Sequence, residues 1–199
     1  MLLFYGIHLS DEQTVAPWSG RFIKWIESIR MERDSGNTAL KAYLEELAYL
    51  RQLIATVNRA ILKLARSAEY ATPIKVLKSA PGVSTLTAMI LLTELCDMAR
   101  FASLDSLCNY VGLIPAIKSS GETEDVRGIT PRRNAHLRWI LIEAAWVAVR
   151  KDPALMMAFA QYCKRMRKNR AIVKIAKKLL NRIRYILKHQ TPYVPCVTE

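Results

Sequence analysis

Apolar residues recur every three or four positions over much of the chain, which is the spacing of one face of an α-helix. The longest such series runs from residue 40 to residue 68 in alternating steps of three and four. This a/d pattern covers about four heptads and is typical of a coiled coil. Its members are Leu40, Tyr43, Leu47, Leu50, Ile54, Val57, Ile61, Leu64 and Ala68.

A single helix with this seam would expose an apolar stripe to water, so the predicted coiled coil over residues 37–70 needs a helical partner. The partner is either a second copy of the chain or another helix of the same chain, and the pattern does not separate the two. We favour the first and expect a homo-oligomer that assembles through residues 40–68. Residues 1–36 form a linker segment that contains one short amphipathic helix within residues 18–31.

A second region, residues 73–194, begins after the break that we predict at Pro73. Two short apolar helices flank a Pro81-Gly82-Val83 turn, and Ser84 suits the N-cap of the second helix. This pattern, over about residues 73–97, fits a helix-hairpin-helix, in which the turn and the following helix N-terminus face a DNA phosphate. A plain helical hairpin with a Pro-Gly turn is the alternative.

The apolar pattern in the rest of this region predicts four more helices. Gly112 follows the first of them in the position of a C-terminal cap. Residues 116–131 are mostly polar and contain two glycines, Gly121 and Gly128, and we predict a loop there. No strand is required anywhere. We therefore predict an all-α fold, a long coiled-coil helix followed by a helical domain that contains the helix-hairpin-helix. The four predicted helices span residues 103–111, 132–150, 153–167 and 169–189.

The positive charge of the chain indicates the class of macromolecule that it binds. The formal net charge is +13 and the isoelectric point is about 9.8, which favours nucleic acid over an anionic membrane surface. From Arg127 to Lys188 we count 17 Lys or Arg residues against two acids, Glu143 and Asp152. The surface that binds the partner is therefore predicted to be C-terminal, and a merely solvated basic helix face is the alternative.

Several other classes of protein are disfavoured. The four cysteines show no CxxC spacing and no paired histidines, so we expect neither a disulfide framework nor a zinc site. No apolar run reaches the roughly 18 residues that a membrane span needs. The first residues lack the basic and apolar regions of a signal peptide. We expect a cytoplasmic protein without a membrane partner.

One stretch combines a nucleophile, glycine and positive charge. Ser119 and Ser120 precede Gly121 in the predicted loop, and a group of cations follows. A phosphodiester gains negative charge while it is attacked, and clustered arginines stabilise that charge. The residues that we expect to bind DNA here and at the hairpin turn are Pro81, Gly82, Val83, Ser84, Arg127, Arg132, Arg133, His136 and Arg138.

Short motifs also follow one another in a specific order. They are Pro81-Gly82-Val83, Glu94, Arg100-Phe101, Tyr110-Val111-Gly112, Ser119-Ser120-Gly121, Gly128-Ile129-Thr130, Asn134, Leu137-Arg138 and Glu143. This series resembles the C-terminal domain of the insertion sequence one-ten family of transposases, the DEDD type related to the Piv DNA invertase. The resemblance covers residues 73–194, and the coiled coil and residues 1–36 resemble the middle region of that family.

The resemblance implies a function in DNA transposition. Family members join an N-terminal RuvC-like domain, whose four acids bind Mg²⁺, to a helical domain that supplies a serine nucleophile. The serine immediately before glycine matches Ser120, with Ser119 as the fallback. The family recombines DNA through a serine-linked intermediate, and some members are guided by a structured RNA. DNA is therefore the expected partner, with a guide RNA as a second candidate.

The chain departs from the family pattern in two ways. No strand-rich, acid-bearing segment precedes the coiled coil, so the RuvC-like domain is missing and we expect no metal site in this chain. Arg133 replaces a glycine of the family motif, and Glu122, Glu124 and Asp125 would repel a nearby phosphate. We expect a DNA-binding transposase portion that is not active alone. The alternative is a non-catalytic dimeric nucleic-acid-binding remnant or a regulator of the full-length recombinase.

Overall fold

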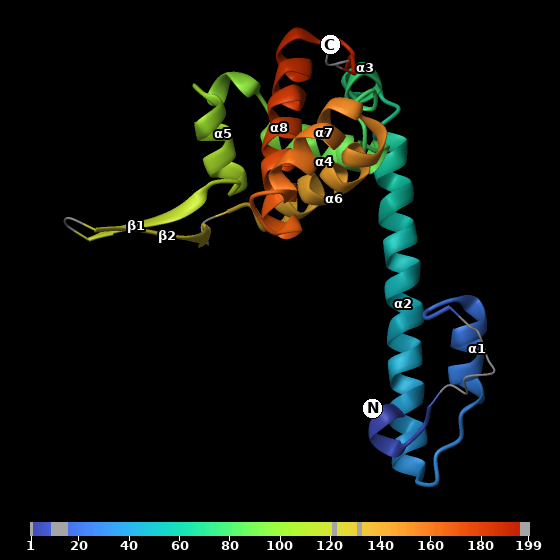
Figure 1. Ribbon diagram of the computed structural model, residues 1–199. Helices are drawn as coiled ribbons and strands as arrows, with labels where there is room; N and C mark the ends of the chain where they lie inside the picture. Colours follow the sequence, from blue (N-terminus) through green and yellow to red (C-terminus); the bar gives the residue numbers. More distant parts are fainter. Residues whose placement is uncertain (1, 9–15, 121–122, 131–132, 196–199) are drawn as a thin grey trace. The chain divides into compact units, whose positions relative to one another are not determined.

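The computed structural model describes residues 2–8, 16–120, 123–130 and 133–195, and in this part it has eight α-helices and one two-stranded sheet (Figure 1). The chain folds as two compact units, Met1–Val57 and Asn58–Glu199. The boundary between them falls inside the long helix α2 (Asp34–Leu64).

The first unit has a small core at the start of α2. The predicted short helix is present as α1 (Gly20–Ser28), and Ser19 caps it by accepting a hydrogen bond from the Phe22 backbone N–H. The buried side chains of this core come from α1, from the connecting segment and from α2. They are Ile26, Met31 and Leu40. A short 3-10 helix, η1 (Leu2–Tyr5), precedes α1.

The predicted seam lies on α2, but its last member does not. Helix α2 ends at Leu64, and Ala68 begins the next helix, α3 (Ala68–Leu77). The boundary predicted at Pro73 is therefore wrong, because Pro73 lies inside α3 and the break falls at residues 65–67. Ser67 provides the extended N-cap backbone there, and the fixed φ of proline is tolerated in a short helix that forgoes one backbone hydrogen bond.

Middle members of the seam lie at the surface. Leu50, Ile54 and Val57 keep 44%, 59% and 48% of their surface exposed. This is an unusual amount of water contact for aliphatic side chains in one stripe. A helical partner for the stripe stays a prediction.

The core of the second unit forms around α8 (Lys168–His189). Its apolar face packs on α6 (Ala135–Lys151), α7 (Pro153–Cys163), α3 and α5 (Leu104–Val111), and the elements surround it in Figure 1. The buried residues of α8 are Ala171, Ile172, Ile175, Ala176, Leu179, Leu180, Ile183 and Ile186. The helices expected in this half are all present, with ends shifted by up to four residues.

The turn between α3 and α4 (Thr85–Leu95) is held tightly against α6. Ser84 caps α4, since its Oγ accepts a hydrogen bond from the Thr87 backbone N–H. Gly82 has φ +84°, and a Cβ built on it would meet the carbonyl oxygen of Ala144 at 2.3 Å. Glycine is thus required both by the backbone conformation and by the close approach to α6. The predicted helical pair is present, and the helix-hairpin-helix stays a prediction.

A β-hairpin replaces most of the predicted loop. Strands β1 (Pro115–Ser120) and β2 (Thr123–Ile129) pair antiparallel, and the hairpin extends away from the helices of its unit (Figure 1). The strands are rich in polar residues and contain a glycine, so the sequence did not indicate them, and only the backbone groups that face the partner strand are hydrogen-bonded within this two-stranded sheet. The all-α prediction therefore describes the core, and the hairpin is an addition outside it.

The C-terminal segment is tied to the helices by a buried carboxylate. Asp152 caps α7 at the Leu155 backbone N–H, pairs with Arg182 at 2.9 Å and accepts a hydrogen bond from the Tyr193 hydroxyl. Burial alone would raise the pKa of Asp152, but the hydrogen bonds of Tyr193 and Leu155 and the charge of Arg182 lower it overall. Burial, and then the bond to Asp152, raise the pKa of Tyr193. The Tyr193 backbone N–H also donates to Ser79 Oγ at 2.7 Å.

Replacing Gly82 with alanine tests the fit of the turn against α6. We expect Gly82→Ala to lower the free energy of unfolding of the second unit by about 2 kcal/mol or more, from the positive φ and the clash with Ala144 together. Urea unfolding followed by circular dichroism measures this. Gly6→Ala is the control, because Gly6 has φ +69° and open space around it. Equal losses in the two variants would contradict the close packing on α6.

Candidate functional site

The predicted site residues fall at three places in the second unit. Ser119 and Ser120 form the end of β1, next to the hairpin connection. Arg133, His136 and Arg138 lie at or just before the start of α6. The turn residues Pro81, Gly82, Val83 and Ser84 lie between α3 and α4. Gly121 and Arg132 lie outside the described residues.

The backbone register separates the serines from the first arginine. Ser120 pairs with Thr123 at the far end of the hairpin, whereas Arg127 pairs with Ala116 near its base. At about 3.3 Å per residue, four residues of strand place roughly 13 Å of backbone between these two pairs. The backbone positions therefore do not bring Ser120 next to Arg127, as the expected cluster of serine and cations would require. The two serines lie at the end of a strand and not in an open loop.

A network of hydrogen bonds holds the base of the hairpin. The Asn134 side chain caps α6 through the Leu137 backbone N–H and donates to Glu94 Oε2 at 2.6 Å. Arg138 Nη1 donates to the carbonyl oxygens of Gly112 and Thr130, at 3.4 and 3.3 Å. Burial, and then the charge of Arg133, lower the pKa of Arg138. The motifs Glu94, Gly112, Asn134 and Arg138 therefore position the hairpin.

Two further motif residues join this base through their rings. The guanidinium of Arg100 lies 4.9 Å from the ring centres of both Phe101 and Tyr110. The Tyr110 hydroxyl donates to the Glu94 carbonyl at 3.3 Å, and its backbone carbonyl accepts from the Asn134 N–H. Such cation–π and hydrogen-bond contacts fix α5 relative to α4 and α6.

His136 takes part in an exposed aromatic pair. Its ring is roughly parallel to that of Trp139, with ring centres 6.3 Å apart, and 60% of the Trp139 surface is exposed. The sequence placed His136 among the cations, whereas Trp139 was expected only as part of an apolar helix. An exposed indole on a basic domain is a surface on which a nucleobase can stack.

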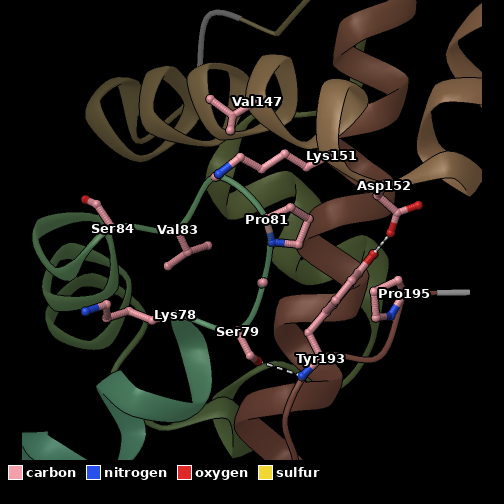
Figure 2. Close-up of a pocket in the computed structure, with 12 residues that line it drawn as sticks. Lys78, Ser79, Pro81, Val83, Ser84, Val147, Lys151, Asp152, Tyr193 and Pro195 are labelled. Atoms are coloured by element: carbon pink, nitrogen blue, oxygen red, sulfur yellow. Dashed lines mark hydrogen bonds between the residues drawn. The ribbon is translucent and has the colours of Figure 1, made fainter.

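A first cavity, the turn cavity, lies beside the α3–α4 turn (Figure 2). It has a volume of about 540 Å³ and is lined by the turn, by Lys78, by Lys151 at the end of α6 and by Tyr193. Figure 2 shows the Lys151 side chain reaching across the turn, away from the Asp152–Tyr193 hydrogen bond. Lys78 and Lys151 are exposed. The sequence analysis selected the turn but neither lysine.

A second cavity, the basic groove, lies at the base of the hairpin. It has a volume of about 440 Å³, and its walls come from the hairpin base, the α7–α8 connection and the first turns of α8. Lys177 in this groove pairs with Asp105 at 2.9 Å, and that hydrogen bond raises the pKa of Lys177. The lining residues are Leu113, Ile114, Pro115, Ile129, Arg165, Met166, Asn169, Arg170, Val173, Lys174 and Lys177.

The described residues do not form a metal site. Among the described residues, no three histidine, cysteine, aspartate or glutamate side chains gather closely enough to hold a metal ion. The donor set that Mg²⁺ prefers, several carboxylate oxygens, is therefore not assembled by that part of the chain. None of the described helices is both long and apolar enough to cross a membrane.

Comparison with known proteins gives one consistent result. Residues 74–161 match the family described as "Transposase IS116/IS110/IS902 family". A putative transposase y4qE of Sinorhizobium fredii is 29% identical over 129 residues, which are 65% of this chain and 30% of that protein. The transposase for insertion sequence element IS1111A of Coxiella burnetii is 32% identical over 120 residues, 58% of this chain and 33% of that protein.

The matched residues, 74–161, cover several elements of the second unit. They include the α3–α4 turn, the hairpin with its base and most of α7, and they end before α8. The chain spans about a third of the length of these relatives. The resemblance inferred from the ordered motifs is thereby confirmed: residues 74–161 of the chain are similar to the IS116/IS110/IS902 family of transposases.

Proposed function

We propose that this chain is the DNA-binding part of a transposase, and that it holds the DNA backbone at the α3–α4 turn. The turn cavity carries this proposal, because a helix N-terminus and two exposed lysines, Lys78 and Lys151, meet there. Backbone N–H groups at a helix start and ammonium groups together favour a phosphate. In this role α3 and α4 act as a helix-hairpin-helix that reads no bases.

The hairpin supplies the second element of the proposal, a nucleophile at Ser120 with Ser119 as the fallback. The hydroxyl oxygen attacks the phosphorus of a DNA phosphodiester, so a serine–phosphate ester forms and the bond from phosphorus to one sugar oxygen breaks. The serine proton passes to a base, and the released sugar oxygen takes up a proton. Support comes from the family match across residues 115–129 and from the hydrogen-bonded base that holds the hairpin.

The proposal leaves metal chemistry to another polypeptide or domain. The described residues do not fit Mg²⁺, and the chain covers about a third of its relatives. We therefore expect DNA cleavage only when a RuvC-like part is supplied. A guide RNA is a second candidate ligand for the same basic surfaces, since phosphate contacts do not separate RNA from DNA.

The exposed stripe on α2 favours a second candidate function. A chain that dimerises through residues 40–68 and binds DNA without cleaving it would act as a non-catalytic regulator of a full-length recombinase. The exposed Leu50, Ile54 and Val57 support the dimer. The two candidates share DNA binding and differ in whether Ser120 reacts.

Salt titration tests the shared step. We expect the logarithm of duplex affinity to fall steeply with the logarithm of salt concentration, because phosphate contacts release counterions. Lys151→Ala should weaken binding and reduce the slope by about one. Lys24→Ala, a change of an exposed lysine on α1, is the control and should leave the slope as it was. A flat salt dependence would show that the positive charge does not bind nucleic acid.

Covalent trapping tests the nucleophile. The protein is incubated with element-end DNA and a RuvC-like part from a relative, and protein–DNA adducts are separated on a denaturing gel. We expect adducts with the wild type and with Ser119→Ala, and at least a hundredfold fewer with Ser120→Ala, because no other hydroxyl replaces the attacking oxygen. Loss in Ser119→Ala alone would move the role to Ser119, and adducts in both variants would remove it from both.

Gel filtration with light scattering tests the dimer. We expect the wild type to elute as an oligomer and the double variant Leu50→Lys, Val57→Lys as a monomer, since two charges in the seam must lose water on assembly. Tyr49→Lys is the matched control, because Tyr49 is 64% exposed on α2 but lies outside the seam. An unchanged mass in the double variant would show that the stripe does not join two chains.

A further inference from the structure

We infer that the basic groove binds one unpaired nucleotide of a DNA strand, with the base against the apolar wall and the phosphate at the cationic rim. The inference rests on the proposed DNA binding and adds to it the part of the substrate that the hairpin base contacts. It concerns residues of the α7–α8 connection and of α8 that no predicted site included.

The hairpin side of the groove is apolar. Leu113, Ile114 and Pro115 enter the hairpin and Ile129 leaves it, and their side chains form one wall. The volume of about 440 Å³ lies within the range of small-molecule sites, which are mostly apolar with a few placed polar groups. In a duplex the bases are stacked and paired. Only an unpaired base can place its flat face on such a wall.

The opposite side of the groove is cationic. Arg165, Arg170 and Lys174 line it and are exposed, and none of the described lining residues is acidic. The ammonium of Lys177 is already paired with Asp105, so its charge is partly neutralised. Three cations beside an apolar wall match a nucleotide, which joins a flat base to a charged phosphate.

The start of α8 adds two features that suit this ligand. Its N-cap is Arg167, which makes no side-chain capping hydrogen bond to the first turn. The positive end of the helix dipole therefore faces the groove without an acidic or hydroxyl cap, which favours an anion. Asn169 lines the groove and carries an amide that can both donate and accept at a base edge.

The position of the groove links it to strand exchange. Pro115 is the first residue of β1 and Ile129 the last residue of β2, so a bound nucleotide would lie where the hairpin meets the helical domain. Recombination separates paired strands, and a site for an unpaired base at this point would hold one strand open. Unstacking a base costs free energy, which contacts of the base with the apolar wall and of the phosphate with the cations would offset.

Fluorescence of 2-aminopurine tests the inference, because this base brightens when it leaves a stack. A single-stranded oligonucleotide with one 2-aminopurine and a duplex of the same sequence are titrated with wild-type protein, with Arg170→Ala and with Ile129→Ser. We expect brightening on single-strand binding, and about tenfold weaker single-strand affinity in both variants with less than threefold change for the duplex. Lys178→Ala is the matched control, an exposed cation of α8 outside the groove.

The outcomes separate this inference from the proposed function. Equal losses for single strand and duplex in Arg170→Ala would show a backbone contact only and overturn the base site. So would single-strand binding that leaves the 2-aminopurine dim, or an unchanged single-strand affinity in Ile129→Ser. Duplex binding that depends on Lys151, together with no single-strand binding, would remove the inference alone. No binding of either DNA would remove the proposed function as well.

Discussion

Burial of one face of α8 is the constraint on which the second unit depends. Eight of its residues are buried, and α3, α5, α6 and α7 all contact this helix. Because an α-helix repeats every 3.6 residues, burying one face places the residues between them at the surface. In α8 those residues include Arg170, Lys174 and Lys178. The packing that stabilises the domain thus also presents its positive charge.

The sequence predicted the helices well, because their signals are local. The helical period was readable, and the N-cap expected at Ser84 and the C-cap expected at Gly112 are both present. The hairpin was missed because its strands are short, rich in polar residues and paired only with each other, and their sequence shows no alternation of apolar and polar positions. The break at residues 65–67 was also missed, since the apolar spacing of the seam continues through it.

The candidate site was less predictable than the fold. The sequence pointed to Ser120 and the α3–α4 turn, but it gave Arg138 a DNA contact where the structure shows bonds to two carbonyl oxygens. It noted the dense cations of the C-terminal half, yet nothing local indicated that Arg165 and Arg170 lie beside the hairpin base. Such neighbours are set by helix packing between distant segments, which neither spacing nor composition encodes.

Because Gly82 packs closely against Ala144, helix α6 sets the distance between the α3–α4 turn and the base of the hairpin. The N-cap of this helix is Asn134, which holds the hairpin base, and Ala144 in the middle of the helix lies against the turn. At 1.5 Å per residue the ten steps between Asn134 and Ala144 span about 15 Å, roughly the length of four nucleotides in a strand. If a DNA strand binds both at the turn and at the hairpin base, as proposed, a rigid helix of this length would fix the number of nucleotides between the two contacts. That number would not depend on the nucleotide sequence.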